Sequence, residues 1–140
     1  MNNYSQAREE YNKFIQRSGS FNEKYAGYLS IALSYLYENK PEESLKQIKD
    51  LARLSKEKNE NYHFLSNLGY EAAILCEFGK PNEGLLKYLE MEKLIASEKL
   101  SQRERDRLLL YMNNNLAYAY AINNDFLKAY EKAELFKQDI

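Results

Sequence analysis

Few side chains in this 140-residue chain have the type and spacing that catalysis or metal binding requires. His63 is the only histidine and Cys76 the only cysteine, so metal-ligand pairs and an internal disulfide are both excluded. General-base catalysis by His63 would need an oriented partner, and Cys76 is expected to be a small buried hydrophobe. The carboxylates of 9–10 and 42–43 fall at helix starts or on polar faces, where they complement the helix dipole. We therefore expect no enzyme activity, no catalytic residue, no metal site and no bound cofactor.

The charge of the chain is nearly balanced, with 20 basic and 21 acidic residues and a net charge of −1. Such a balance gives no field that would attract a phosphate backbone or an anionic membrane. The run 103–107 alternates in sign, which is typical of a solvated helix start rather than of a nucleic-acid patch. The first residues lack a basic start followed by an apolar run, and no window approaches a membrane span. We expect a soluble, cytoplasmic protein without membrane or direct nucleic-acid partners.

An internal sequence repeat predicts the helices that position these side chains. Segments 39–45, 79–85 and 124–130 each contain a turn-forming residue, a polar step, and a helix start with a small residue five positions after the turn former. The small residues, 40 and 45 positions apart, are Ser44, Gly84 and Ala129. Self-similarity at this period indicates a stack of helical hairpins in a single domain.

Local signals divide the chain into helices. Segments 20–23 and 101–104 read as capping boxes, and Pro41 and Pro81 suit the first helical position. The predicted helices are 4–17, 21–38, 41–57, 61–78, 81–98, 102–122 and 125–138. Those that follow the repeated turns carry one apolar stripe, whereas those that precede the turns are apolar over more of their circumference. This alternation predicts an all-α fold, an α-solenoid of antiparallel helix pairs rather than a four-helix bundle.

The pattern resembles the tetratricopeptide repeat, a hairpin of helix A and helix B with large, small and aromatic residues at fixed steps. The first hairpin matches through Tyr28, Ile31, Ala32, Tyr35, Ser44, Ile48 and Leu51. The second matches through Leu68, Ala72, Leu75, Gly84, Tyr88 and Met91. The third matches through Leu116, Ala117, Tyr120, Ala129, Ala133 and Phe136. The leading helix fits a lone helix B through Ala7, Tyr11 and Phe14. Glu71 stands where the family has leucine, and Asn113 replaces a large residue.

The resemblance implies a right-handed α-solenoid covering residues 1–140, with repeats longer than the usual length of about 34 residues. It contains a leading helix at 4–17 and three hairpins at about 21–57, 61–98 and 102–138. Small residues at Ala32, Ala72 and Ala117 would let helix A approach helix B closely.

In such an array, helix A residues that avoid both neighbours line a concave groove. The family's register places there Leu29, Leu33, Tyr37, Ser66, Tyr70, Ala73, Glu77, Tyr111, Asn114, Asn115, Tyr118 and Ile122. This aromatic, amide-rich set suits a peptide, because tyrosine rings cover apolar side chains and amides pair with a bound backbone. Positions that hold chaperone C-terminal carboxylates in other family members are mostly apolar or tyrosine here, so chaperone-tail binding is not expected.

The sequence thus predicts a non-catalytic module that binds a protein or peptide segment. Two alternatives stay open. One is the ligand-sensing domain of a bacterial transcriptional regulator or signalling protein whose output domain lies outside this chain. The other is a self-assembling structural adaptor whose groove is filled by a neighbouring copy. Separately, apolar residues left open on a terminal helix would favour a homodimer.

Overall fold

The computed structural model describes residues 3–139, and these residues form α-helices joined by short turns, with no strand. The helices are α1 (Tyr4–Arg17), α2 (Phe21–Tyr37), α3 (Pro41–Glu57), α4 (Asn61–Glu77), α5 (Pro81–Ser97), α6 (Gln102–Ile122) and α7 (Phe126–Asp139). Their ends lie within one residue of the sequence-based bounds. The all-α prediction is confirmed.

The turns owe their shape to residues that tolerate a left-handed backbone. Asn39, Gly79 and Asn124 have φ values of 63°, 89° and 65°, and each is the turn former of a repeated segment. Asn59, with φ of 57°, makes a fourth turn between α3 and α4 that the repeat did not reveal. Asparagine and glycine adopt this conformation more readily than other residues, which explains their positions here.

The serines predicted to cap α6 and α2 do so, although only the α6 cap forms the complete capping box. The Ser101 hydroxyl accepts from the Glu104 amide at 3.1 Å, and the Glu104 carboxylate accepts from the Ser101 amide at 2.9 Å. This reciprocal pair is the capping box predicted for α6. At the start of α2, the Ser20 hydroxyl accepts from the Glu23 amide at 3.2 Å.

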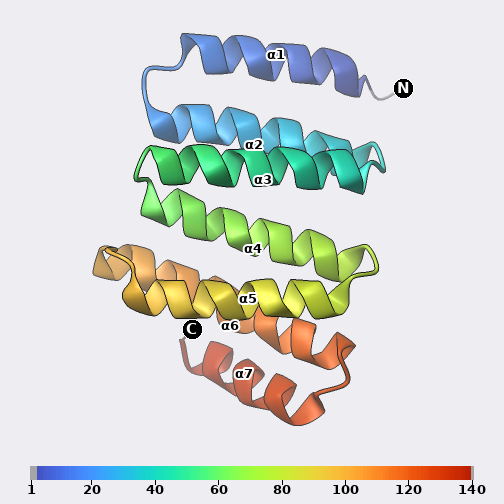
Figure 1. The fold of residues 1–140 in the computed structure, drawn as a ribbon, viewed down its shortest axis with the longest axis vertical. Helices are drawn as coiled ribbons and strands as arrows, with labels where there is room; N and C mark the ends of the chain where they lie inside the picture. The colour runs from blue at the N-terminus through green and yellow to red at the C-terminus, as the bar shows by residue number, and fades with distance from the viewer. Residues whose placement is uncertain (1–2, 140) are drawn as a thin grey trace.

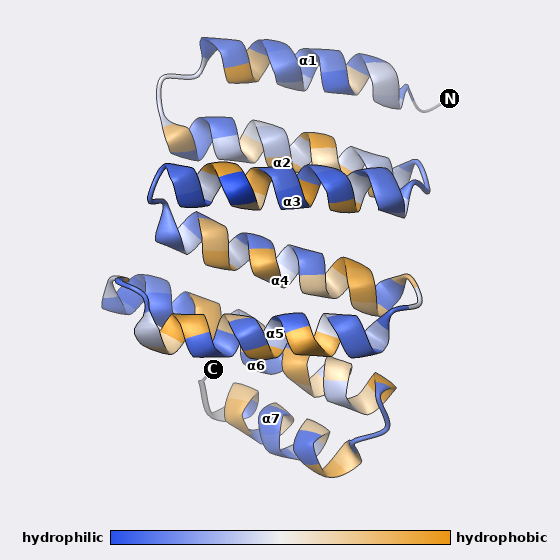
Figure 2. Cartoon of the chain, viewed as in Figure 1, coloured by the Kyte–Doolittle hydropathy of each residue, from blue (hydrophilic) through white to orange (hydrophobic). Residues whose placement is uncertain are grey.

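Each helix packs against the next, so the chain forms a stack that begins with α1 and ends with α7 (Figure 1). In that view α3 and α5 lie in front of α2 and α6, which gives the stack two layers. The visible side of α3 is largely hydrophilic, as expected for a helix with a single buried stripe (Figure 2). Within the described part of the chain, every helix falls short of a membrane span in length or in apolar content.

The closest helix approach in the second hairpin depends on Gly84. A Cβ atom added there would lie 2.4 Å from the Cys76 Sγ and 2.8 Å from the Ala72 carbonyl oxygen. Ala32 and Ala72 are fully buried, as expected for helix A residues that face helix B. Ala117 is only half-buried although α7 packs against α6, so the expected close packing at this third small residue is wrong.

A buried amide links the first hairpin to the second. Asn67 of α4 is completely buried; its side-chain nitrogen donates to the Ile48 carbonyl of α3, and its side-chain oxygen accepts from the Tyr25 hydroxyl of α2 at 3.2 Å. The Tyr25 hydroxyl is buried with it, and burial raises the pKa of Tyr25 above its usual value. Both partners therefore satisfy groups that would otherwise be desolvated without a hydrogen bond.

The departure from the family pattern at Glu71 also has a structural reason. Glu71 is buried, and the Lys87 ammonium of α5 lies 3.7 Å from its carboxylate. Although burial opposes the charge of Lys87, the nearby Glu71 and Glu90 carboxylates raise the pKa of Lys87. An ion pair thus takes the place of an apolar contact between α4 and α5.

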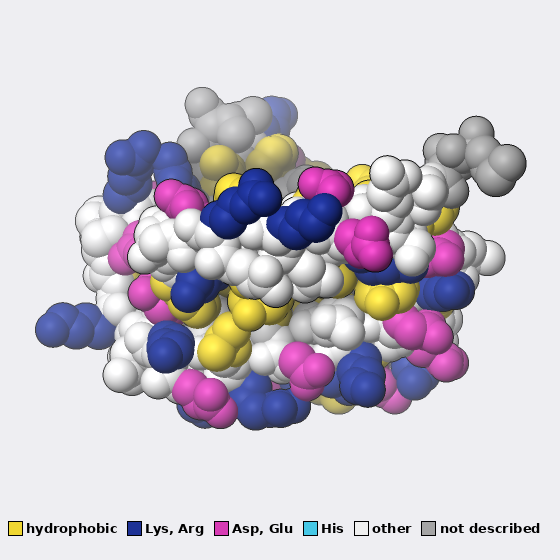
Figure 3. All heavy atoms as spheres, turned by 90° about the horizontal axis from the view of Figure 1, so that it is seen from above, with side chains coloured by type: hydrophobic (Ala, Val, Ile, Leu, Met, Phe, Trp, Pro, Cys, Tyr) yellow, Lys and Arg dark blue, Asp and Glu magenta, His cyan; other side chains and the backbone are white. Residues whose placement is uncertain are grey.

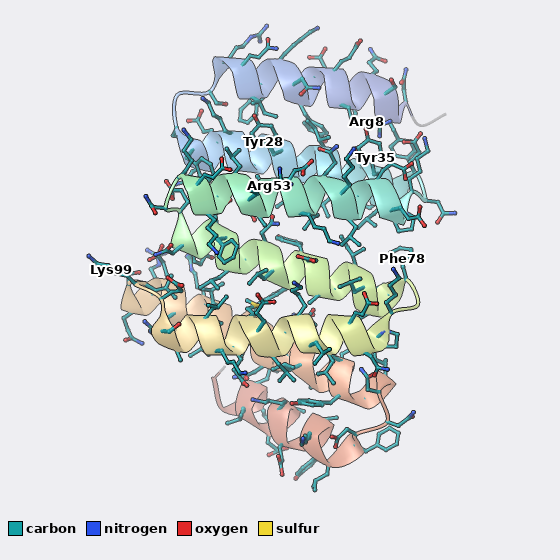
Figure 4. All side chains as sticks on the ribbon, viewed as in Figure 1. Arg8, Tyr28, Tyr35, Arg53, Phe78 and Lys99 are labelled. Atoms are coloured by element: carbon teal, nitrogen blue, oxygen red, sulfur yellow. The ribbon has the colours of Figure 1, made fainter. Side chains whose placement is uncertain are left out.

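The two ends of the stack differ. The Arg8 guanidinium of α1 lies 4.1 Å from the centre of the Tyr35 ring and 2.9 Å from the Glu38 carboxylate, which fixes α1 on α2 (Figure 4). Seen from this end, acidic and basic side chains are interspersed and apolar side chains form small separate areas (Figure 3). Helix α7 instead leaves Phe126, Leu127 and Tyr130 between 64% and 70% exposed.

Candidate functional site

A small, partly open cavity lies between α4 and α6, and we call it the tyrosine pocket. Its volume is about 160 Å³, and its lining residues are Tyr62, Ser66, Tyr70, Arg107, Leu108 and Tyr111. The α4 residues recur at every fourth position, and Arg107 and Tyr111 are also four apart. Residues at this spacing share one helix face, which is why both helices present them to the same space.

Gly69 shapes one wall of the tyrosine pocket. A Cβ atom added at Gly69 would lie 2.7 Å from the Tyr111 ring, so the ring occupies space that any other residue would fill. The Tyr111 side chain also neighbours the buried Tyr88 of α5. The Tyr111 ring therefore packs on Gly69 and Tyr88 at the pocket wall, and the residue is 37% exposed.

Two hydroxyl groups of the tyrosine pocket, those of Tyr70 and Tyr111, remain protonated at neutral pH. Burial, followed by the neighbouring Tyr70, raises the pKa of Tyr111 to about 12. Burial, followed by Tyr62, raises the pKa of Tyr70. Each hydroxyl can therefore both donate and accept a hydrogen bond.

A second cavity of about 400 Å³ continues the tyrosine pocket toward the N-terminal ends of α2, α4 and α6. Its lining residues are Asn22, Glu60, Tyr62, His63, Arg103, Glu104 and Arg107. Tyr62 and Arg107 line both cavities. We refer to the two cavities together as the groove.

His63 is fixed in the second cavity by neighbours from α2. Its ring lies 4.3 Å from the Tyr25 ring and 5.5 Å from the Phe21 ring, and its Nε2 atom hydrogen-bonds the Asn22 side-chain oxygen. Burial lowers the pKa of His63, although the Glu60 and Glu104 carboxylates oppose this shift. The imidazole is consequently neutral at pH 7 and acts as a polar part of the wall.

The arginines of segment 103–107 have different environments. Arg105 donates to the Ile95 carbonyl and, at 3.3 Å, to the Glu98 carbonyl, so it stabilises the C-terminal end of α5. Arg103 and Arg107 face the groove, and within residues 3–139 neither forms an ion pair. Arg103 and Arg107 are exposed, as predicted for a solvated helix start, and they also line the groove.

Three of the residues expected in the groove lie together in the tyrosine pocket: Ser66, Tyr70 and Tyr111. Glu77 and Tyr118 form a second group, since the Glu77 carboxylate is close enough to raise the pKa of Tyr118 by its charge and a hydrogen bond. Both are exposed.

The remaining expected residues stand apart from the tyrosine pocket. Asn115 donates to the Tyr111 carbonyl of its own helix at 2.7 Å, which gives its amide a local partner. Asn114 is exposed on α6, Leu33 is half-buried in α2, and Tyr37 is 76% exposed at the end of α2. None of these four residues lines either cavity of the groove.

Sequence reasoning missed Tyr62 and Arg107, the two residues that connect the cavities. A signal was present, because Tyr62 precedes Ser66 by four residues and Arg107 precedes Tyr111 by four. Extending the predicted faces by one turn toward the helix starts would have included both. His63 and Arg103 were noted for other reasons but were not placed in the groove.

Comparison with known proteins gives no further guide to the site, since the chain matches no family model, no curated protein and no solved structure. The interpretation of the groove therefore depends on its own residues.

Proposed function

We propose that this chain is a non-catalytic interaction module that binds an extended peptide or protein segment in the groove. The observation that carries the proposal is the tyrosine pocket, where three tyrosine rings and the unpaired Arg107 surround a concave space. Tyrosine and arginine are the residues on which protein recognition most often depends, because rings supply apolar area and both side chains supply hydrogen bonds.

We also propose that the helical repeat is of the tetratricopeptide type. Support comes from the buried Ala32 and Ala72, and from Gly84 at the point where α5 comes closest to α4. The same groove would serve a scaffold protein or the ligand-sensing domain of a bacterial regulator, since both bind a peptide in this way. A native gene that encodes a DNA-binding or signalling domain beside this chain would favour the regulator.

Selection from a random displayed-peptide library tests the proposed function. Ser66→Phe fills the tyrosine pocket, whereas Leu86→Phe adds the same ring at a position 66% exposed on α5, outside the residues that line the groove. We expect peptides enriched on the unmodified chain to bind Leu86→Phe equally and Ser66→Phe at least about tenfold more weakly. Equal binding to both variants would refute a groove site, provided that circular dichroism shows both to be folded.

A second candidate function is self-association through α7, as in a structural adaptor. The exposed apolar side chains of α7 favour it, because Phe126, Leu127 and Tyr130 are each at least 64% exposed. Sedimentation equilibrium at micromolar concentration should show a dimer that Leu127→Glu abolishes. A monomer at every concentration would refute it.

A further inference from the structure

We infer that the tyrosine pocket takes one aromatic side chain of the bound segment, and that Arg107 pairs with a carboxylate next to that side chain. This inference rests on the proposed function, because it specifies which segments the groove selects.

The size of the tyrosine pocket sets the first requirement. Its volume of about 160 Å³ is close to that of an engineered cavity of about 150 Å³ that binds benzene. One ring-sized group therefore fits, whereas a longer stretch of peptide must continue into the second cavity of about 400 Å³. The aromatic side chain thus anchors the segment, and its neighbours extend toward Tyr62 and Arg107.

The walls of the tyrosine pocket set the second requirement. Tyr62, Tyr70 and Tyr111 offer ring faces and edges against which an aromatic ring packs favourably. The Tyr62 and Tyr70 hydroxyls, together with Ser66, supply hydrogen-bond partners for a polar edge of that ring, whereas Tyr111 already hydrogen-bonds Tyr88. An aliphatic side chain would fill the space but would leave these hydroxyls without partners once water is displaced, which disfavours it.

Charge sets the third requirement. Arg107 is the only charged residue among those described as lining the tyrosine pocket, and Arg103 lies one turn away on α6. Two like charges at this spacing repel each other, so an acceptor between them would be favourable. The second cavity also holds the Glu60 and Glu104 carboxylates, but within residues 3–139 neither forms an ion pair with Arg107, and both lie outside the tyrosine pocket. The free cation beside the aromatic anchor is therefore Arg107, and its complement is a carboxylate.

The absence of tryptophan from the chain allows a direct test. Two blocked probes are titrated, acetyl-Gly-Ser-Trp-Glu-Ser-Gly-amide and its order-reversed form with Glu before Trp, because the direction of the segment is not fixed. Tryptophan emission then reports the probe alone. We expect a saturable blue shift with at least one order. Replacing its Glu by Gln should weaken binding about tenfold, and replacing its Trp by Leu, measured by competition, should weaken binding at least as much.

Protein variants assign these effects to the groove. Arg107→Gln should bind the Glu probe about tenfold more weakly than the unmodified chain does, and it should bind the Gln probe with unchanged affinity. The two probes should therefore bind this variant equally well. Lys93→Gln, an exposed cation on α5, is the matched control and should change neither affinity. A free C-terminal acid in place of the amide distinguishes a terminal from a side-chain carboxylate as the preferred partner of Arg107.

The outcomes separate this inference from the proposed function. If library peptides bind in a manner that Ser66→Phe abolishes but carry no aromatic–acidic pair, the inference is overturned and the proposed function stands. If neither probe binds saturably although Ser66→Phe abolishes the binding of library peptides, the inference is again overturned and the proposed function stands. If no peptide depends on Ser66, the proposed function is overturned and this inference with it.

Discussion

Replacing Gly84 by alanine tests the close packing that holds α5 against α4. The added Cβ atom would lie 2.4 Å from the Cys76 Sγ, 2.8 Å from the Ala72 carbonyl oxygen and 3.0 Å from the Cys76 amide nitrogen. Favourable contacts between nonbonded carbon atoms lie at about 3.5–4.0 Å. Two of the three obstructing atoms belong to the α4 backbone, so the helices must separate rather than a side chain rotate.

The expected magnitude follows from two opposing effects. Overpacking of this kind costs about 1–3 kcal/mol, whereas alanine gains up to about 1 kcal/mol over glycine in helix propensity. Because two of the obstructing atoms are backbone, the overpacking cost should lie in the upper half of its range, about 2–3 kcal/mol. After the gain in helix propensity, we expect Gly84→Ala to lower the free energy of unfolding by about 1–2 kcal/mol. Gly69→Ala gains the same propensity, but its Cβ meets the Tyr111 ring, which is 37% exposed and can move toward the groove. Gly69→Ala should therefore be nearly neutral or stabilising.

Urea denaturation followed by circular dichroism measures both variants. Adding Cys76→Ala to Gly84→Ala removes the nearest obstructing atom, so the two substitutions should couple favourably by about 0.5 kcal/mol or more. If Gly84→Ala is as stable as the unmodified chain, or if Cys76→Ala and Gly84→Ala show no coupling, the close packing of α5 on α4 at Gly84 is refuted.

Three further predictions concern buried or half-buried polar groups, and urea denaturation measures each. Asn67→Leu leaves the Tyr25 hydroxyl buried without its acceptor and should cost about 1–3 kcal/mol, part of which Tyr25→Phe recovers; additive losses would contradict this. Lys87→Met leaves the buried Glu71 carboxylate without its cation, and it should lower the free energy of unfolding by about 2 kcal/mol, less than breaking a fully buried pair. Adding Glu71→Leu to Lys87→Met should restore stability. No recovery in this double variant would argue against the ion pair. Burial lowers the folded-state pKa of His63. Its contribution to the free energy of unfolding is therefore complete above the unfolded-state pKa of about 6.5 and is lost as pH falls through the folded-state pKa. His63→Gln should reduce this pH dependence of the free energy of unfolding, and an unchanged profile would refute the prediction.

The repeated pattern was sufficient to predict the fold because its signals are local. A turn former such as Gly79 and a capping serine such as Ser101 determine helix ends through their own backbone contacts. The site was predictable only in part. Ser66 and Tyr111 followed from helical periodicity, but Arg107 did not, because its alternating-sign neighbours resemble a solvated face. Only the packing of α4 beside α6 shows that Arg107 lines the pocket, whereas Arg105 contacts α5.

The central claim is that the groove between α4 and α6 binds a peptide, and backbone amide shifts in a titration with acetyl-Gly-Ser-Trp-Glu-Ser-Gly-amide or its order-reversed form test it most directly. We predict that the largest shifts lie in segments 62–70 and 107–111, and that α1 and α7 are unaffected. Largest shifts on α7, or no saturable shift with either probe or with a peptide selected from the library, would contradict the claim.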